Sequence, residues 1–220
     1  MRRINRAVTI GGVLALGMAG GVASPAVAAP GGATNWHVGV YNASGRALSE
    51  GEAAHPGDGL ATFRFTTTPD TALLIDTQGS QAGNLLGDLT GETVTATFTV
   101  AGSEADQFTY YGEGAPTPAP TARLFFETSG AGGFDPAHYW WSNPVGFAQL
   151  GPGTFTLTAT VIPGDWSDYN GQEGTTVQDG FAAAAAHVTG IGLSFGGGGF
   201  FENGVGSPDA TLTLSSFTAG

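Results

Sequence analysis

Residues 93–100 read TVTATFTV, and residues 154–161 read TFTLTATV. In both segments an apolar side chain alternates with threonine, so a strand formed here has one apolar face and one face that carries hydroxyls. Threonine suits the exposed face because its branched Cβ fits the pleat and its hydroxyl is solvated. The two segments therefore predict a pair of similar, half-buried β-strands.

The rest of the chain continues this pattern. Short apolar or alternating segments are separated by clusters of Gly, Pro, Asp and Asn, and no repeat recurs at a fixed period. One helix is expected around Val177–His187, where an alanine run favours helix, with Thr175 or Thr176 as its N-cap. The further expected strands are 36–41, 61–67, 72–76, 107–111, 122–127, 138–141, 190–195 and 210–217. We expect an all-β fold: a two-sheet antiparallel β-sandwich of the jelly-roll type with one short α-helix.

The N-terminus has the pattern of a secretory signal peptide. Arg2, Arg3 and Arg6 precede a short apolar run, and the motif Ala26-x-Ala28 offers small residues to a signal peptidase. We expect the signal peptide to span 1–28, a flexible lead-in 29–33, and one β-sandwich domain 34–220. The protein is then secreted and extracellular, with no membrane span after the signal peptide.

Composition narrows the classes of partner. The net charge is −12 with no lysine, and it falls to about −15 once the three N-terminal arginines are removed. Such a surface repels nucleic acid and anionic lipid, so both are excluded as expected partners. The chain has no cysteine, so no disulfide supports the fold and a core must hold it together.

The stretch AHYWWSNP at 137–144 places three large aromatic residues side by side. If 138–141 is a strand, Tyr139 and Trp141 share one face, and His138 and Trp140 share the other. We assign Tyr139 and Trp141 to the core and Trp140 to the outer face, where an exposed ring stacks on a sugar. The candidate ligand-binding residues are Trp140, Tyr111, Trp166 and Arg123. The alternative remains open that the rings fill two covered faces of the sheet.

The segment GDWSDYNGQEG at 164–174 is a second candidate site. Asp165, Asp168, Asn170 and Glu173 supply oxygen ligands in a glycine-bounded loop, as Ca²⁺ prefers, so a structural Ca²⁺ is the possible cofactor. The alternative is a solvated acidic turn around a packed Trp166.

Catalytic motifs are missing from the sequence. It contains neither a G-x-S-x-G elbow nor an H-E-x-x-H motif, and its four histidines lack ligand spacing. A glycosidase needs two facing carboxylates, and Glu113, Glu127, Asp135 and Glu202 are the candidates for such a pair. Whether the protein is an enzyme stays open at this point.

The C-terminal half resembles a known group of proteins. The segments RLFFETSG, HYWWSNP, TLTATVIPGDWSDYNGQEGT, HVTGIGLSFGGGGFFENGVG and TLTLSSF, within 85–217, are similar to secreted bacterial β-sandwich proteins, some of which carry an exosortase-type sorting tail. The resemblance implies a galactose-binding or carbohydrate-binding-module jelly roll and no settled activity. We therefore expect a non-catalytic binding module for a glycan or polysaccharide. The alternatives are a structural or matrix protein, and a glycan-active hydrolase or lyase.

Overall fold

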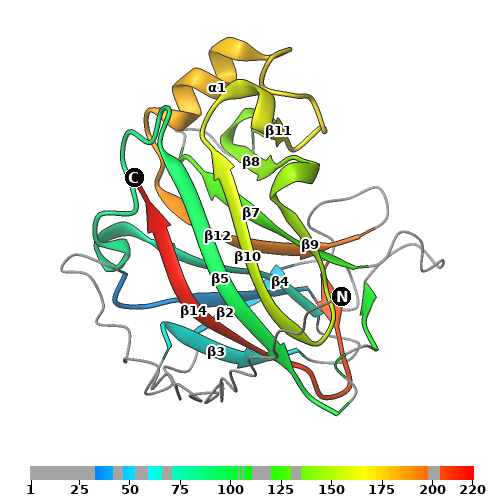
Figure 1. Cartoon of the computed structure of the whole chain (residues 1–220). Helices are drawn as coiled ribbons and strands as arrows, with labels where there is room; N and C mark the ends of the chain where they lie inside the picture. Colours follow the sequence, from blue (N-terminus) through cyan, green and yellow to red (C-terminus); the bar gives the residue numbers. More distant parts are fainter. Residues whose placement is uncertain are drawn as a thin grey trace, which may run out of the picture.

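A computed structural model shows two antiparallel β-sheets packed face to face (Figure 1). The structure describes residues 33–41, 47–52, 59–65, 71–103, 105, 107–110, 120–129, 135–197 and 204–220. The all-β, two-sheet antiparallel sandwich expected from the alternating segments is confirmed. The predicted signal peptide 1–28 and residues 29–32 of the lead-in predicted over 29–33 lie outside the described residues.

The strands of the described residues divide into a large and a small sheet. The large sheet contains β1 (His37–Tyr41), β2 (Ala47–Glu52), β4 (Thr71–Gln78), β6 (Thr109–Tyr110), β7 (Thr121–Glu127), β8 (Tyr139–Ser142), β9 (Phe147–Gln149), β11 (Trp166–Asp168), β12 (Gly190–Gly196) and β13 (Val205–Gly206). The small sheet contains β3 (Ala61–Arg64), β5 (Thr93–Ala101), β10 (Gly153–Thr160) and β14 (Thr211–Ala219). The strand order is β11-β8-β7-β12-β4-β1-β2 in the large sheet and β10-β5-β14-β3 in the small one. Within the large sheet, β9 pairs with β7, while β13 pairs with β4 and β6.

The two similar threonine-rich segments are neighbours in the small sheet. β5 and β10 pair antiparallel, and threonine lies opposite threonine along the whole outer face. The hydroxyl oxygens of Thr97 and Thr156 are 3.1 Å apart, and those of Thr99 and Thr154 are 2.9 Å apart. Cross-strand hydroxyl pairs of this kind stabilise an antiparallel sheet and fix its register.

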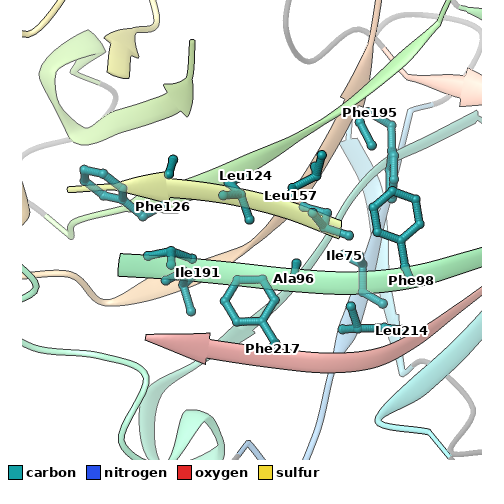
Figure 2. Close-up of a cluster of buried hydrophobic side chains, with 14 of the residues drawn as sticks. Ile75, Ala96, Phe98, Leu124, Phe126, Leu157, Ile191, Phe195, Leu214 and Phe217 are labelled. Atoms are coloured by element: carbon teal, nitrogen blue, oxygen red, sulfur yellow. The ribbon is translucent and has the colours of Figure 1, made fainter. Parts of the chain in front are cut away.

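The core lies between the sheets. Figure 2 shows side chains of the small sheet, such as Phe98 and Phe217, meeting side chains of the large sheet, such as Leu124 and Phe195. These residues are buried, as the alternating pattern of their strands requires. Hydrophobic burial between the two faces therefore provides the main stabilisation.

The helix α1 (Gln178–Ala185) closes one end of the sandwich (Figure 1). It buries Phe181, and the Phe181 ring centroid lies 5.0 Å from that of Trp140. The predicted threonine N-cap is wrong: Val177 is the N-cap residue and makes no side-chain capping bond. No helix of the described residues is long and apolar enough to cross a membrane.

In the described part of the chain, four short 3-10 helices lie between strands, at Gly79–Ala82, Pro136–His138, Pro144–Gly146 and Pro163–Asp165. In the last three, proline occupies one of the first two positions, where its missing N–H costs no hydrogen bond. The turn Pro136–His138 also places His138 before β8, so the strand predicted over 138–141 begins one residue later than expected.

Gly192 in β12 provides a test of the sheet geometry. A Cβ at this position would lie 2.0 Å from the carbonyl oxygen of Ile75 on the neighbouring strand. We expect Gly192→Ala to lower the free energy of unfolding by at least about 2 kcal/mol, because backbone atoms must move to admit the methyl group. Chemical denaturation measures this change.

Gly164→Ala is the matched control, since nothing lies within 4 Å of a Cβ added there. The control should change stability by less than about 0.5 kcal/mol. Equal stability of the two variants would contradict the close approach of β4 and β12.

Candidate functional site

The register of β7 and β8 determines which aromatic rings enter the core. Phe126 lies opposite Trp140, and Phe125 lies opposite Trp141. Phe126 and Trp140 belong to the core cluster between the sheets, whereas Phe125 and Trp141 project from the other side of the large sheet. We call this other side the outer face. The face assignment predicted for Tyr139, Trp140 and Trp141 is therefore reversed.

Trp140 is 0% exposed, which corrects its prediction as the leading ligand contact. Its ring stacks at 6.4 Å from Phe126, and its indole Nε1–H donates to the carbonyl oxygen of Ala137 at 2.8 Å. Both the ring and its polar atom are thus used inside the fold. The error arose because β8 carries large rings on both faces, so alternation alone does not show which face meets the other sheet.

Trp166 is corrected in the same way. It is fully buried, its ring centroid lies 4.7 Å from that of Phe126, and its Nε1–H donates to the carbonyl oxygen of Thr160 at 2.8 Å. Trp166 begins β11 and faces the interior beside Trp140. Tyr111, the third aromatic candidate, lies outside the described residues and stays a prediction.

Four aromatic rings gather instead on the outer face. The centroid of Trp141 lies 5.3 Å from that of Phe125, 6.5 Å from that of Tyr139 and 6.0 Å from that of Tyr169. We call Phe125, Tyr139, Trp141 and Tyr169 the outer aromatic cluster. Phe125 and Trp141 are buried, Tyr139 is half-buried, and Tyr169 is 49% exposed. The cluster therefore has a covered base and an accessible rim.

One hydrogen bond holds the base of this cluster. The indole Nε1–H of Trp141 donates to Ser194 Oγ at 2.9 Å, so the ring reaches from β8 across β7 to β12. Gly192 of β12 lies directly opposite Phe125, so no side chain of β12 projects from the outer face at this position.

Polar side chains border the rim. Glu127 lies opposite Tyr139, and Gly190 lies opposite both Glu127 and Gln78 on the next strands. A Cβ at Gly190 would lie 2.8 Å from Glu127 Oε1, so the Glu127 side chain occupies the space over this glycine. Gln78 is exposed and donates from Nε2 to the buried Asp76 Oδ2 at 2.6 Å. The outer face thus combines ring surfaces with carboxylate and amide groups.

Arg123 lies on the outer face, two residues before Phe125 in β7. Its Nη1 donates to the carbonyl oxygen of Ser142 at 2.8 Å, and its guanidinium lies 5.4 Å from the ring centroid of Phe147. Partial burial lowers the pKa of Arg123, because desolvation disfavours the charged form. These contacts orient the side chain, and its role in ligand binding stays a prediction.

The acidic loop is built around Asp168. The carboxylate of Asp168 is buried, and its Oδ1 accepts hydrogen bonds from the backbone N–H groups of Asn170 at 2.9 Å and Gln172 at 2.8 Å. Bonds of this kind are typical of an Asx turn, in which a carboxylate closes the backbone of its own loop. Asp168 therefore folds the segment.

The carboxylates predicted as calcium ligands do not gather around one point, and a Ca²⁺ ion in this loop stays a prediction. Within the described residues, no three His, Cys, Asp or Glu side chains gather so that they could hold a metal ion. Asp165, Asp168 and Glu173 therefore do not converge, and Asn170 is joined to Asp168 through its backbone. Glu173 Oε2 accepts instead from the hydroxyl of Thr175 at 3.3 Å.

Sequence reasoning missed Tyr169 and the outer position of Tyr139. The signal that could have found Tyr169 is the alternation through β11, which sends Trp166 inward and Ser167 outward before the loop begins. Gly190 and Gly192, two residues apart in a strand, were a second signal, because they leave one face of that strand without side chains.

Comparison with known proteins adds little. No family model and no curated protein matches the chain. A solved structure of a mutant xylanase, Xylanase10C from Cellvibrio japonicus in complex with xylopentaose, aligns with 84% of this chain at 18% identity and a TM-score of 0.39. The chain spans only 28% of that xylanase chain. A likeness at this level says nothing about what the present protein binds.

The Asp168 turn yields a stability prediction. Asp168→Ala removes the acceptor of two backbone N–H groups, and we expect it to lower the free energy of unfolding by about 1–3 kcal/mol. Asn170→Ala, an exposed position in the same loop, should cost less than about 0.5 kcal/mol. Thermal or chemical denaturation compares the two. If both variants matched the unsubstituted protein, Asp168 would not be holding the loop.

Proposed function

We propose that this protein is a secreted, non-catalytic binding module for a glycan, and that the rim of the outer aromatic cluster contacts the sugar. The observation that carries the proposal is the combination of Tyr139 and Tyr169, two accessible rings on a rigid base, with polar side chains beside them. Neither ring is needed to fill the space between the sheets.

The chemistry of the rim suits a pyranose. A flat aromatic ring packs against the apolar C–H face of a sugar, while neighbouring polar groups bond to its hydroxyls. Tyr169 offers the more exposed ring, and the carboxylate of Glu127 can accept from a sugar hydroxyl. Gln78 adds an amide group on the same face.

The rigidity of the base supports binding without large rearrangement. Trp141 is fixed by its bond to Ser194, and its ring is flanked by Phe125, Tyr139 and Tyr169. A preorganised platform loses little conformational entropy when a ligand stacks on it. Adhesion to an extended polysaccharide is thereby favoured over capture in a deep cavity.

The negative charge of the protein affects which glycans it can bind. The chain carries a net charge of −12, and Glu127 adds a carboxylate at the rim itself. Polyanionic glycans are therefore repelled, and neutral glycans are the expected ligands.

A substitution at the rim tests the proposal. We expect the purified protein to bind one or more neutral polysaccharides saturably in a panel, and Tyr169→Ala to weaken this binding at least about tenfold, or about 1.4 kcal/mol. The weakening follows from the loss of a ring that is 49% exposed and can stack on the ligand. Isothermal titration calorimetry or affinity electrophoresis measures the change.

Ile162→Ala is the matched control, because Ile162 is also exposed, at 43%, and apolar but is not among the rings of the outer aromatic cluster. It should leave binding unchanged. Absence of saturable binding across the panel, or equal loss in both variants, would contradict the proposal and favour a structural role. Release of new reducing ends from a bound polysaccharide would favour a hydrolase instead.

A further inference from the structure

β10 forms one edge of the small sheet. Its partner in that sheet is β5, and no other strand of the described residues pairs with it. With eight residues, β10 is longer than the other edge strands of the described sheets, β3, β2 and β11. An edge of this length presents a row of backbone N–H and C=O groups.

The hydrogen bonds of the sheet show which groups face outward. Thr93 exchanges backbone bonds with Gly220 on the β14 side, so Thr93 and Thr160 form a pair that is not hydrogen-bonded. The carbonyl oxygen of Thr160 consequently points away from β5, where it accepts from Trp166 Nε1. Because the pattern repeats every second residue, the N–H and C=O groups of Thr154, Thr156 and Thr158 also point away from β5.

These three residues are accessible. Thr154, Thr156 and Thr158 are exposed, and in the described part of the chain no backbone bond outside the β5 pairing reaches them. Natural edge strands are commonly protected by a charge, a proline or a bulge. The sequence of β10, GTFTLTAT, contains no charged residue and no proline, and its register with β5 is unbroken.

The identity of the existing partner indicates what fits this edge. β5 (TVTATFTVA) and β10 have almost the same alternating pattern, and they pair with threonine opposite threonine and Phe98 opposite Phe155. The rings of that phenylalanine pair stack at 5.4 Å. A strand that already pairs with its near-copy has the side chains to pair with a second copy of itself.

We propose that two copies of this chain associate edge to edge through β10, antiparallel about a two-fold axis, to make one continuous sheet. Thr156 then lies opposite its own counterpart, and Thr154 lies opposite Thr158 of the second copy. The two-fold axis adds the pair of Thr158 with Thr154 of the second copy. Each of the three pairs exchanges two backbone hydrogen bonds. The absence of charge along β10 also keeps carboxylates out of the contact, which matters for a chain of net charge −12. Association through β10 does not depend on glycan binding at the outer face.

Substitutions at matched positions of β10 and β5 test the association. We expect the purified protein to shift from monomer toward twice the monomer mass as its concentration rises, measured by analytical ultracentrifugation. Thr156→Lys should shift the association at least tenfold to higher concentration, because two lysines would face each other at the two-fold axis. Thr97→Lys places the same residue on the same face of the central strand β5, and it should associate as the unsubstituted protein does.

A backbone probe separates edge pairing from an effect of charge. Thr156→Pro removes an N–H that points away from β5, so the ladder to β5 stays intact while the edge loses a donor. It should abolish the association and keep the circular dichroism spectrum of the unsubstituted protein. A monomer mass at every attainable concentration would overturn the proposal. So would equal effects of Thr156→Lys and Thr97→Lys in proteins that are both folded.

Discussion

Alternation along the paired strands β7 and β8 is the constraint on which the rest of the structure depends. β7 carries two adjacent aromatic residues and β8 carries three, and a strand must send neighbours to opposite faces. Phe126 and Trp140 therefore enter the core, while Phe125 and Trp141 form the base of a cluster on the outer face. A shift of one residue in this register would exchange the two sets. The core and the candidate site are thus specified by one register.

Small residues on β12 make the outer arrangement possible. Gly190 leaves space for the Glu127 side chain, and Gly192 lies opposite Phe125. The site therefore rests on contacts that also stabilise the sheet. Tyr139 and Tyr169, at the rim, are the rings that can meet a ligand without disturbing those contacts.

The fold could be predicted from the sequence because local pattern and environment agree in β5 and β10, where one face is apolar and the other hydroxylated. Which face of β8 enters the core could not be predicted, because β8 has large rings on both faces. Alternation alone does not say which face is the core. The acidic loop could not be read from the sequence for a different reason. A glycine-bounded run of carboxylates does not show whether its members converge, and in the described residues no three of them gather, while Asp168 accepts two backbone N–H bonds of its own loop. Tyr169 was missed because it follows a strand of three residues that the sequence did not reveal.

The most direct test of this account follows the four tryptophan indole N–H signals by NMR, assigned by single Trp→Phe substitutions, while a neutral oligosaccharide that binds the protein is added. The account predicts that the Trp141 signal moves with saturation, because its ring underlies the rim, whereas Trp140 and Trp166 stay in place inside the core. Movement of Trp140 or Trp166 without Trp141 would contradict the assignment of the two faces and the place of the site.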